Sequence, residues 1–400
     1  MSVDEWVPVE RMPEGGESRR NDKYGMTHIH QFMTKRNMIT YAVAVEAANK
    51  SRSMFALTAI TKILTKMYRW APHGKCTAGM PGTLYMPSVT HEYSIYDVLK
   101  RRANKFGEWL SVASNFVDDN VMVSCGDLAH LSMPVNSIDY IFTDPPFGAN
   151  LSYSELSFLW EACLGVKTNN SEEAIMNDTQ GKGLLEYQQL MTDCFKKYYD
   201  VLKPNHWMTV EFHNSQNAVW NAIQESLLRA GFIIADVRTL NKKQGTFQQT
   251  TAHGTVKQDL VISAYKPKES YVHGLLENSG NEVTAWGFVR QHLANIPIVV
   301  VTGDKIEVIA ERQAYLLFDR MVAYHIMQGI LVPLDATDFY RGIEEKFLKR
   351  DGMYFLPDQV NEYDTARIKA DVEPIQYSLF VTNEKTAIVW LYQQLREALI

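Results

Sequence analysis

Ser137-Ile-Asp-Tyr-Ile-Phe-Thr-Asp-Pro-Pro-Phe-Gly148 is the stretch of sequence that decides the fold. Its first part, Ile138–Thr143, is rich in β-branched and aromatic residues, which predicts a short β-strand. Asp144-Pro145-Pro146 ends that strand because two successive prolines cannot continue a hydrogen-bonded ladder. An apolar strand that stops at a stiff polar turn is typical of the carboxyl edge of an open α/β sheet, where such sheets bind ligands.

Other strand-like and helix-like segments alternate around this strand. The further predicted strands are Val121–Cys125, His206–Phe212, Phe232–Arg238 and Leu260–Tyr265. Apolar residues at helical spacing predict helices over Tyr187–Val201, Val219–Leu227 and Ser152–Leu164. This alternation predicts a parallel, doubly wound α/β sheet. The polar stretch 241–258 has no apolar stripe for a crossover helix, so we expect the last two strands to form an antiparallel pair at the sheet edge.

The flanking regions differ in character, which predicts four parts. Residues 1–24 are polar and are expected to form a flexible lead-in, 25–115 a basic helical region, 116–268 the α/β region and 269–400 a mixed α+β region. Helices are expected from Thr34, as N-cap, over Ile95–Ser111, over Arg312–Gly329 and over Thr386–Leu399. A hairpin is expected over 296–309, and a loop over 71–88.

Composition excludes several classes of protein. The chain has 400 residues, 46% hydrophobic and 22% charged, so a disordered chain is excluded. Its four cysteines form no CxxC pair, which argues against a disulfide scaffold or a zinc site. No apolar run approaches the roughly 18 residues of a membrane span, and no signal-peptide pattern opens the sequence. We therefore expect a soluble, cytoplasmic protein with no bound metal.

The charge of the chain is unevenly distributed. The net charge is −6, yet residues 21–110 sum to +8, and a local field of this kind attracts phosphates. A solvated helical surface would give the same pattern. If the partner is a nucleic acid, the expected contacts include Lys35 and Arg36 from this block, with Lys242 and Lys243 from the polar stretch 241–258.

The Asp-Pro-Pro-Phe turn suits one kind of chemistry. It directs the Asp144 carboxylate and the Pro145 carbonyl into the same small volume, beside the ring of Phe147. Two acceptors can hold both N–H groups of an exocyclic base amine, while an aromatic face stacks on the extruded base. Positioning of this kind supports methylation of the amine without a metal or a covalent intermediate. A simple turn that happens to contain Asp-Pro-Pro is the competing interpretation.

The surrounding sequence resembles the amino-group DNA methyltransferases that act on adenine N6 or cytosine N4. The likeness rests on the (D/N/S)PP(Y/F) motif, here Asp144–Phe147, on Gly126-Asp127-Leu128 upstream, and on Val201-Leu202-Lys203-Pro204 downstream. It covers roughly 116–268. Two flanking segments, Gly25–His28 and Met321–His325, look more weakly like the carboxyl half of larger DNA methylases.

The resemblance implies a Rossmann-like sheet that binds S-adenosyl-L-methionine, with DNA as partner. It implies a catalytic set of Asp144, Pro145, Pro146 and Phe147, and cofactor contacts from Gly126, Asp127 and Asp144. From its position alone, Asp127 is equally well explained as a helix N-cap. Tyr153 and Glu155 are candidates for the base pocket, but ordinary helix packing within Ser152–Leu164 is the favoured interpretation.

One element of the family pattern is missing from this sequence. The glycine loop that follows a first strand has no counterpart at Gly79–Gly82, Gly181–Gly183 or Gly303. The middle region offers about five strands, which match the third to seventh strands of a seven-stranded methyltransferase sheet. We therefore expect an incomplete sheet and a second chain that supplies the cofactor half.

Three functions remain open from the sequence. The first is a DNA methyltransferase, for which Asp before Pro-Pro favours adenine N6 over cytosine N4. The second is a catalytically incomplete DNA-binding or regulatory subunit of a methylase system. The third is methylation of RNA or of a protein amide.

Overall fold

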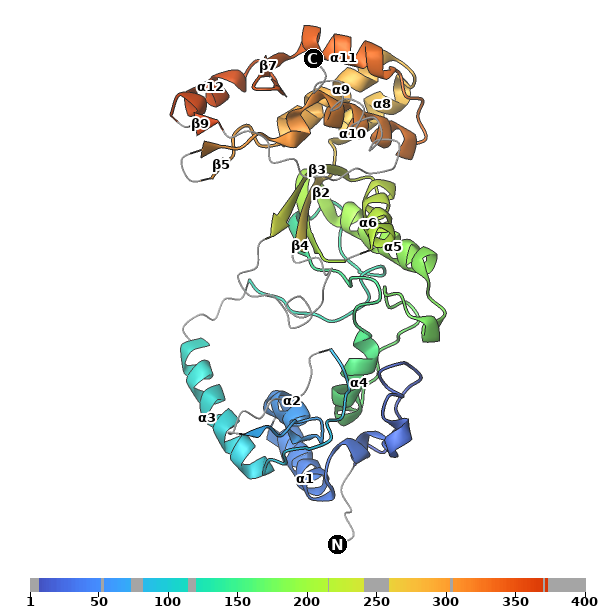
Figure 1. Cartoon of the computed structure of the whole chain (residues 1–400), viewed down its shortest axis with the longest axis vertical. Helices are drawn as coiled ribbons and strands as arrows, with labels where there is room; N and C mark the ends of the chain where they lie inside the picture. The colour runs from blue at the N-terminus through green and yellow to red at the C-terminus, as the bar shows by residue number, and fades with distance from the viewer. Residues whose placement is uncertain are drawn as a thin grey trace. The chain divides into compact units, whose positions relative to one another are not determined.

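The computed structural model describes residues 7–51, 54–72, 82–113, 120–214, 216–240, 259–302, 305–369 and 371–372. The chain divides into two compact units. Figure 1 labels the helices and strands. Unit 1 is Met1–Asp127 with Gly148–Tyr187, and unit 2 is Leu128–Phe147 with Gln188–Ile400. Each unit is described by itself.

The described helices and strands alternate through the middle of the chain. The helices are α1 (Lys35–Ser51), α2 (Met54–Thr61), α3 (Ile95–Ala113), α4 (Tyr153–Leu164), α5 (Leu184–Val201), α6 (Asn217–Arg229), α8 (Glu269–Glu277), α9 (Glu282–Asn295), α10 (Ala314–Met327), α11 (Ala336–Lys346) and α12 (Val360–Lys369). The strands are β1 (Ile138–Thr143), β2 (Leu202–Phe212), β3 (Ile233–Leu240), β4 (Asp259–Tyr265), β5 (Val301–Thr302), β6 (Lys305–Ile306), β7 (Leu348–Arg350), β8 (Met353–Phe355) and β9 (Asp371–Val372).

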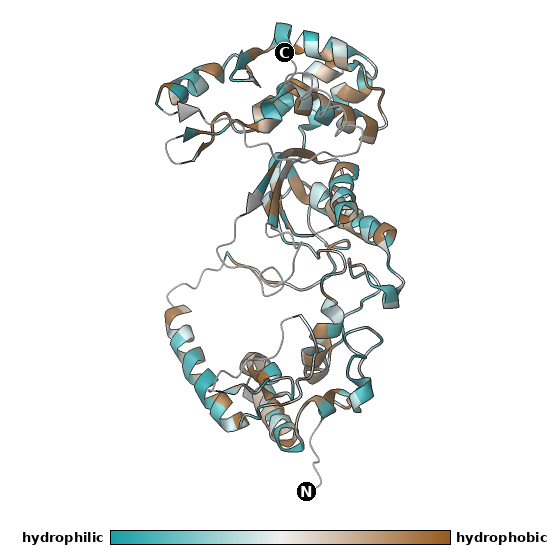
Figure 2. Ribbon diagram, viewed as in Figure 1, coloured by the Kyte–Doolittle hydropathy of each residue, from teal (hydrophilic) through white to brown (hydrophobic). Residues whose placement is uncertain are grey.

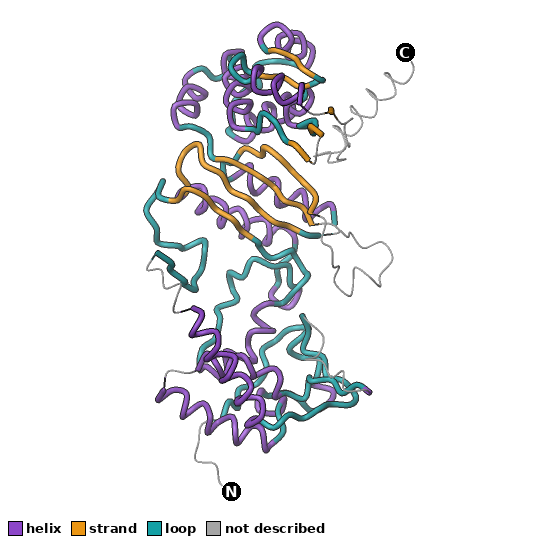
Figure 3. Tube along the Cα trace, turned by 90° about the vertical axis from the view of Figure 1, so that its left-hand side faces the viewer, coloured by secondary structure: helices purple, strands orange, loops and turns teal. Residues whose placement is uncertain are grey.

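Unit 2 is built on a four-stranded sheet in the order β1-β2-β4-β3 (Figure 3). β1 and β2 are parallel, whereas β4 runs antiparallel to both of its neighbours. The mixed α/β fold and these four strands were predicted from sequence and are confirmed, as is the antiparallel pairing of the last two strands. Hydrophobic residues run through these strands in Figure 2.

The prediction of a strand at Val121–Cys125 is wrong. These residues form no strand, and the side chains of Met122 and Val123 are 83% and 92% exposed. A strand needs a hydrogen-bonding neighbour, and among the described residues none pairs with this segment. As a consequence β1 ends the sheet, and in the described part of the chain its outer edge has no partner strand.

In unit 1, α1, α2 and α3 bury a common core that includes Tyr41, Ile60 and Val98. α1 begins after Thr34, whose hydroxyl accepts a hydrogen bond from the Asn37 amide at 3.2 Å, so this predicted N-cap is confirmed. The predicted helix at Ile95–Ser111 is confirmed by α3, and the predicted loop 71–88 has no α-helix or strand among its described residues.

The segment 7–24 is anchored to α4 in unit 1. Glu155, which is only 1% exposed, accepts hydrogen bonds through its Oε2 atom from the amides of Glu17 (2.9 Å) and Ser18 (2.8 Å). Its Oε1 atom accepts a bond from Asn177 Nδ2 at 3.3 Å. Glu155 therefore fixes the backbone of the segment 7–24 on α4, and its role in the structure is to support the fold.

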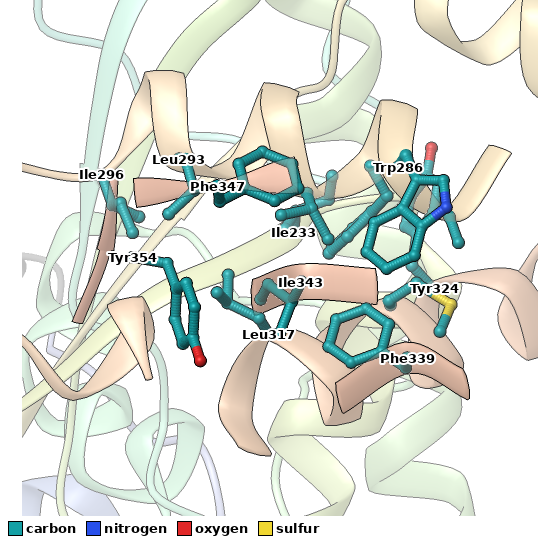
Figure 4. Packing of buried hydrophobic residues seen from close by; sticks show 14 of the residues in the cluster. Ile233, Trp286, Leu293, Ile296, Leu317, Tyr324, Phe339, Ile343, Phe347 and Tyr354 are labelled. Atoms are coloured by element: carbon teal, nitrogen blue, oxygen red, sulfur yellow. The ribbon is translucent and has the colours of Figure 1, made fainter. Parts of the chain in front are cut away.

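The helices after the sheet form a core together with β3 and β4 in unit 2. Ile233, Trp286, Leu317 and Phe339 belong to one buried cluster, seen from close by in Figure 4. The predicted helix near 312–329 is confirmed by α10, and the predicted hairpin by the short antiparallel pair β5 and β6. The predicted helix Thr386–Leu399 lies outside the described residues. No described helix is both long and apolar enough to cross a membrane.

Candidate functional site

The Asp-Pro-Pro-Phe loop leaves unit 2 at the carboxyl end of β1. Asp144 is exposed, Pro145 is buried, and Phe147 is half-buried. Gly148 has φ +73°, in the left-handed region, so a glycine suits the turn that follows Phe147. The predicted end of the strand at Thr143 is confirmed, and a polar carboxylate stands at that end.

The ring of Phe147 is held by the carboxyl end of the neighbouring strand β2. It meets Phe212 edge-to-face, with ring centroids 5.2 Å apart and an interplanar angle of 83°. Phe212 in turn meets Trp220 of α6 at 4.9 Å and 82°. Edge-to-face pairs of this kind fix ring orientation, so the loop is anchored to the sheet by an aromatic chain.

Asn214 fixes the backbone of the loop. Its Nδ2 atom donates to the Phe147 carbonyl at 2.9 Å, and its Oδ1 atom accepts a bond from the Gln216 amide at 2.8 Å. Its own carbonyl accepts a bond from Trp220 Nε1 at 2.8 Å. Asn214 is itself buried, and the hydrogen bonds of its side chain hold the loop against the end of β2.

His213 and Asp259 lie next to each other, near the ring of Phe147. His213 Nδ1 is 2.8 Å from Asp259 Oδ1, with Asp259 almost fully buried at the start of β4. The His213 ring is 6.3 Å from the Phe147 ring. At the end of β1, Tyr198 of α5 donates to the Thr143 hydroxyl at 3.2 Å, and burial raises the pKa of Tyr198, so this phenol stays a neutral donor.

Sequence reasoning missed Asn214, His213 and Asp259. The signal was present, because His213 and Asn214 directly follow the predicted strand at His206–Phe212, at the same sheet edge as Asp144. Polar residues at neighbouring strand ends meet at one edge of a sheet.

The other predicted site residues lie elsewhere. Gly126 and Asp127 belong to unit 1 and lie in exposed coil. Lys35 and Arg36 are exposed at the start of α1, and Arg36 forms an ion pair with Glu92 at 3.4 Å. Lys242 and Lys243 lie outside the described residues. Of the two residues considered for the base pocket, Glu155 is buried against the segment 7–24, and Tyr153 is 40% exposed.

The described residues do not form a complete cradle for S-adenosyl-L-methionine. A cradle of this kind needs a glycine loop after a strand, where the backbone approaches the ligand closely. No such strand and loop occurs in the part of the chain that the structure describes, and the segment before Gly126 is exposed coil. The described residues thus present a polar carboxylate at the end of β1 without a glycine loop.

Replacing Asn214 by leucine is expected to lower the free energy of unfolding by about 1–3 kcal/mol, because the part-buried hydrogen bonds of Asn214 with the Phe147 carbonyl and the Gln216 amide are lost. Urea denaturation followed by tryptophan fluorescence measures this change. The matched control is Asn217→Leu, an exposed position at the start of α6. Equal losses in both variants would show that Asn214 does not anchor the loop.

Residues 138–308 match the family model described as DNA methylase, of the N6/N4 methyltransferase type. The match begins at β1 and contains Asp144–Phe147, so the resemblance proposed from sequence is confirmed for this segment. No curated protein matches the chain in sequence.

Three solved structures are similar to parts of the chain. The [4+2]-cyclase SpnF is 16% identical, with 43% of this chain and 63% of that chain covered and a TM-score of 0.24. A Thermus thermophilus protein, named provisionally as a DNA modification methylase, is 13% identical over 43% and 68% of the two chains, with a TM-score of 0.23. Its complex with S-adenosyl-L-methionine is 10% identical over 63% and 98%, with a TM-score of 0.21.

Proposed function

We propose that the chain is the target-binding part of an S-adenosyl-L-methionine-dependent DNA methyltransferase that acts on an exocyclic base amine, with adenine N6 as the first choice. One observation carries this proposal: an Asp-Pro-Pro-Phe loop at the carboxyl end of β1, inside the segment that matches the DNA methylase family. The cofactor supplies the methyl group, and the residues of this chain hold the amine.

Each member of the loop has a role in this proposal. The Asp144 carboxylate and the Pro145 carbonyl accept the two N–H groups of the amine, which draws its nitrogen toward a tetrahedral form. Phe147 stacks on the base after it has left the helix. The anchoring of Phe147 by Phe212 and Asn214 supports this, because a positioned loop needs no reorganisation when the base arrives.

We further propose that a second chain completes the sheet and contributes the glycine loop, so that a Rossmann-like arrangement forms only in the complex. The outer edge of β1 supports this, because it has no partner strand among the described residues. Tyr140 and Phe142 on β1 are 54% and 61% exposed, so this edge strand also leaves large apolar side chains uncovered. Val121–Cys125, exposed as coil, is the second segment that a partner strand could order.

The isolated chain is expected to show no saturable binding of S-adenosyl-L-methionine, because its described residues lack the glycine loop. Isothermal titration calorimetry on the full chain measures this directly. Micromolar affinity, together with methyl transfer to DNA by the isolated chain, would overturn the second-chain proposal. Digestion of the methylated DNA and mass spectrometry of its nucleosides then distinguishes adenine N6 from cytosine N4.

A second candidate function is a DNA-binding or regulatory subunit without catalysis of its own. The exposed coil at Gly126 and Asp127 favours it, since these residues would otherwise line the cofactor. Methyl transfer that depends on Asp144 would exclude this candidate. The proposed phosphate contacts of Lys35, Arg36, Lys242 and Lys243 are common to both functions and do not separate them.

A further inference from the structure

A small basic pocket lies in unit 1, outside the segment that matches the family model. Its volume is about 200 Å³, and it is lined by Ile63, Tyr68, Tyr93, Val98, Arg101, Arg102 and Lys105. We call these residues the α3 pocket. Three of the seven are cations, and all three come from α3, which is largely hydrophilic in Figure 2.

The cations continue the buried face of α3. Ile95 and Val98 are buried in the core of unit 1, and Arg101, Arg102 and Lys105 follow Val98 by three, four and seven residues. Residues at these spacings share one side of a helix. The helix therefore changes from apolar to basic along a single face, at the place where the pocket opens.

Among the described residues, no acidic side chain forms an ion pair with any of these three cations. Arg101 donates through Nε to the backbone carbonyl of Asp97, at 3.3 Å, and not to a carboxylate. No described acidic residue forms an ion pair with Arg102 or Lys105. Three cations around one pocket repel one another, so an anion inside the pocket would be favoured.

An aromatic wall lies beside the cations. The guanidinium of Arg101 lies over the ring of Tyr93 at 5.4 Å, and Tyr93 meets Tyr68 edge-on at 5.0 Å. His91 packs on Tyr93 at 4.3 Å. The stacked Arg101 is thereby held in place with its remaining donors available, and aromatic rings next to cations are typical of surfaces that bind nucleic-acid strands.

We propose that the α3 pocket binds a backbone phosphate of the DNA, with the adjoining sugar against Tyr93. The pocket is too small for a complete small-molecule ligand, because sites for such ligands usually measure about 300–1,000 Å³. A phosphate that belongs to a longer polyanion fits the smaller space and the three cations. The identification of that polyanion as DNA rests on the proposed function; the anion site itself rests on the pocket.

The test compares two doubly substituted full-length chains that lose the same charge. Arg101→Gln/Lys105→Gln removes two cations of the pocket. Lys100→Gln/Lys167→Gln removes two lysines that do not line it. Fluorescence anisotropy with a short duplex, without cofactor, gives the affinity of each chain at several salt concentrations, and thermal unfolding checks that each chain is folded.

The pocket variant is expected to bind about tenfold more weakly at low salt, and its slope of log affinity against log salt should fall by about two. The control variant should keep a slope near that of the unsubstituted chain. Tyr93→Leu should weaken binding without changing the slope, because it removes the wall and no charge. Equal effects of the two double variants, or no effect of either, would overturn the proposal.

Two further arms identify the source of the phosphate and separate this proposal from the enzymatic one. Inorganic phosphate and thymidine monophosphate, at matched ionic strength, should fail to displace the duplex; displacement by either would assign the pocket to a free anion instead. Methyl transfer by the unsubstituted chain, in the complex that supports the reaction, is measured as the second arm. If methyl transfer proves absent while the slope still changes in the pocket variant, the proposed function fails and the pocket assignment stands.

Discussion

Replacing Asp144 by alanine is expected to reduce methyl transfer to DNA by at least about a hundredfold, in the complex that supports the reaction. The variant loses the charged acceptor that holds the target amine, and loss of one such preorganised contact typically costs a factor of about 10²–10³ in kcat. Because Asp144 is exposed, the stability of the chain should change by less than about 0.5 kcal/mol. Transfer of a labelled methyl group measures the activity.

Two companion variants make this result specific. Asp139→Ala removes another exposed carboxylate of β1, one that forms an ion pair with Lys203, and should leave the activity nearly unchanged. Asp144→Asn keeps an acceptor oxygen but loses the charge, so its activity should lie between those of Asp144→Ala and the unsubstituted chain. If Asp144→Ala retained activity within a few-fold of normal, the assignment of the loop would be wrong.

The sheet could be predicted from sequence wherever a strand is bounded by its own turn residues. β1 ends at Thr143, just before Asp144 and the two prolines, and the polar composition of 241–258 predicted the antiparallel pairing of β3 with β4. Val121–Cys125 carries the same apolar pattern and yet forms no strand. The pattern of apolar residues and their preference for β-structure describe only the segment itself, whereas a strand also depends on a neighbouring strand with which to pair.

The candidate site could be predicted only in part for a related reason. The Asp-Pro-Pro-Phe loop is continuous in sequence, so its four residues were found together. Asn214 reaches the loop from the next parallel strand, and asparagine after a strand is usually a turn residue. For Glu155 the sequence favoured a packing role over the base pocket, but it could not show that backbone amides 137 and 138 residues away bind its carboxylate.

The largest stability change is expected for Arg312, whose side chain is fully buried in unit 2. Its guanidinium has five N–H donors, and the structure gives it five acceptors. These acceptors are the carbonyls of Leu293, Ile296, Pro297 and Tyr354 and the side-chain oxygen of Gln359, at 2.8–3.2 Å. Burial lowers the pKa of Arg312 to about 10, which still leaves the group charged at neutral pH.

Arg312→Met should therefore lower the free energy of unfolding by about 3–5 kcal/mol, because several acceptors lose their donor at once and each costs about 1–3 kcal/mol. Methionine can fill much of the space, but the backbone carbonyls cannot be replaced and would lose their donors. The control is Arg341→Met, an exposed residue of α11 paired with Asp338, for which at most about 1 kcal/mol is expected. Urea denaturation compares the two variants.

The Arg312 variant also tests whether the helices after the sheet stabilise the sheet itself. Leu293 and Ile296 belong to the same buried cluster as Ile233 and Tyr265, which lie on β3 and β4. If the cluster unfolds as one body, Arg312→Met should lower hydrogen-exchange protection in β3 and β4 as much as in α9. Loss of protection confined to α9 and α10 would show that the sheet bearing the Asp-Pro-Pro-Phe loop is stable without them.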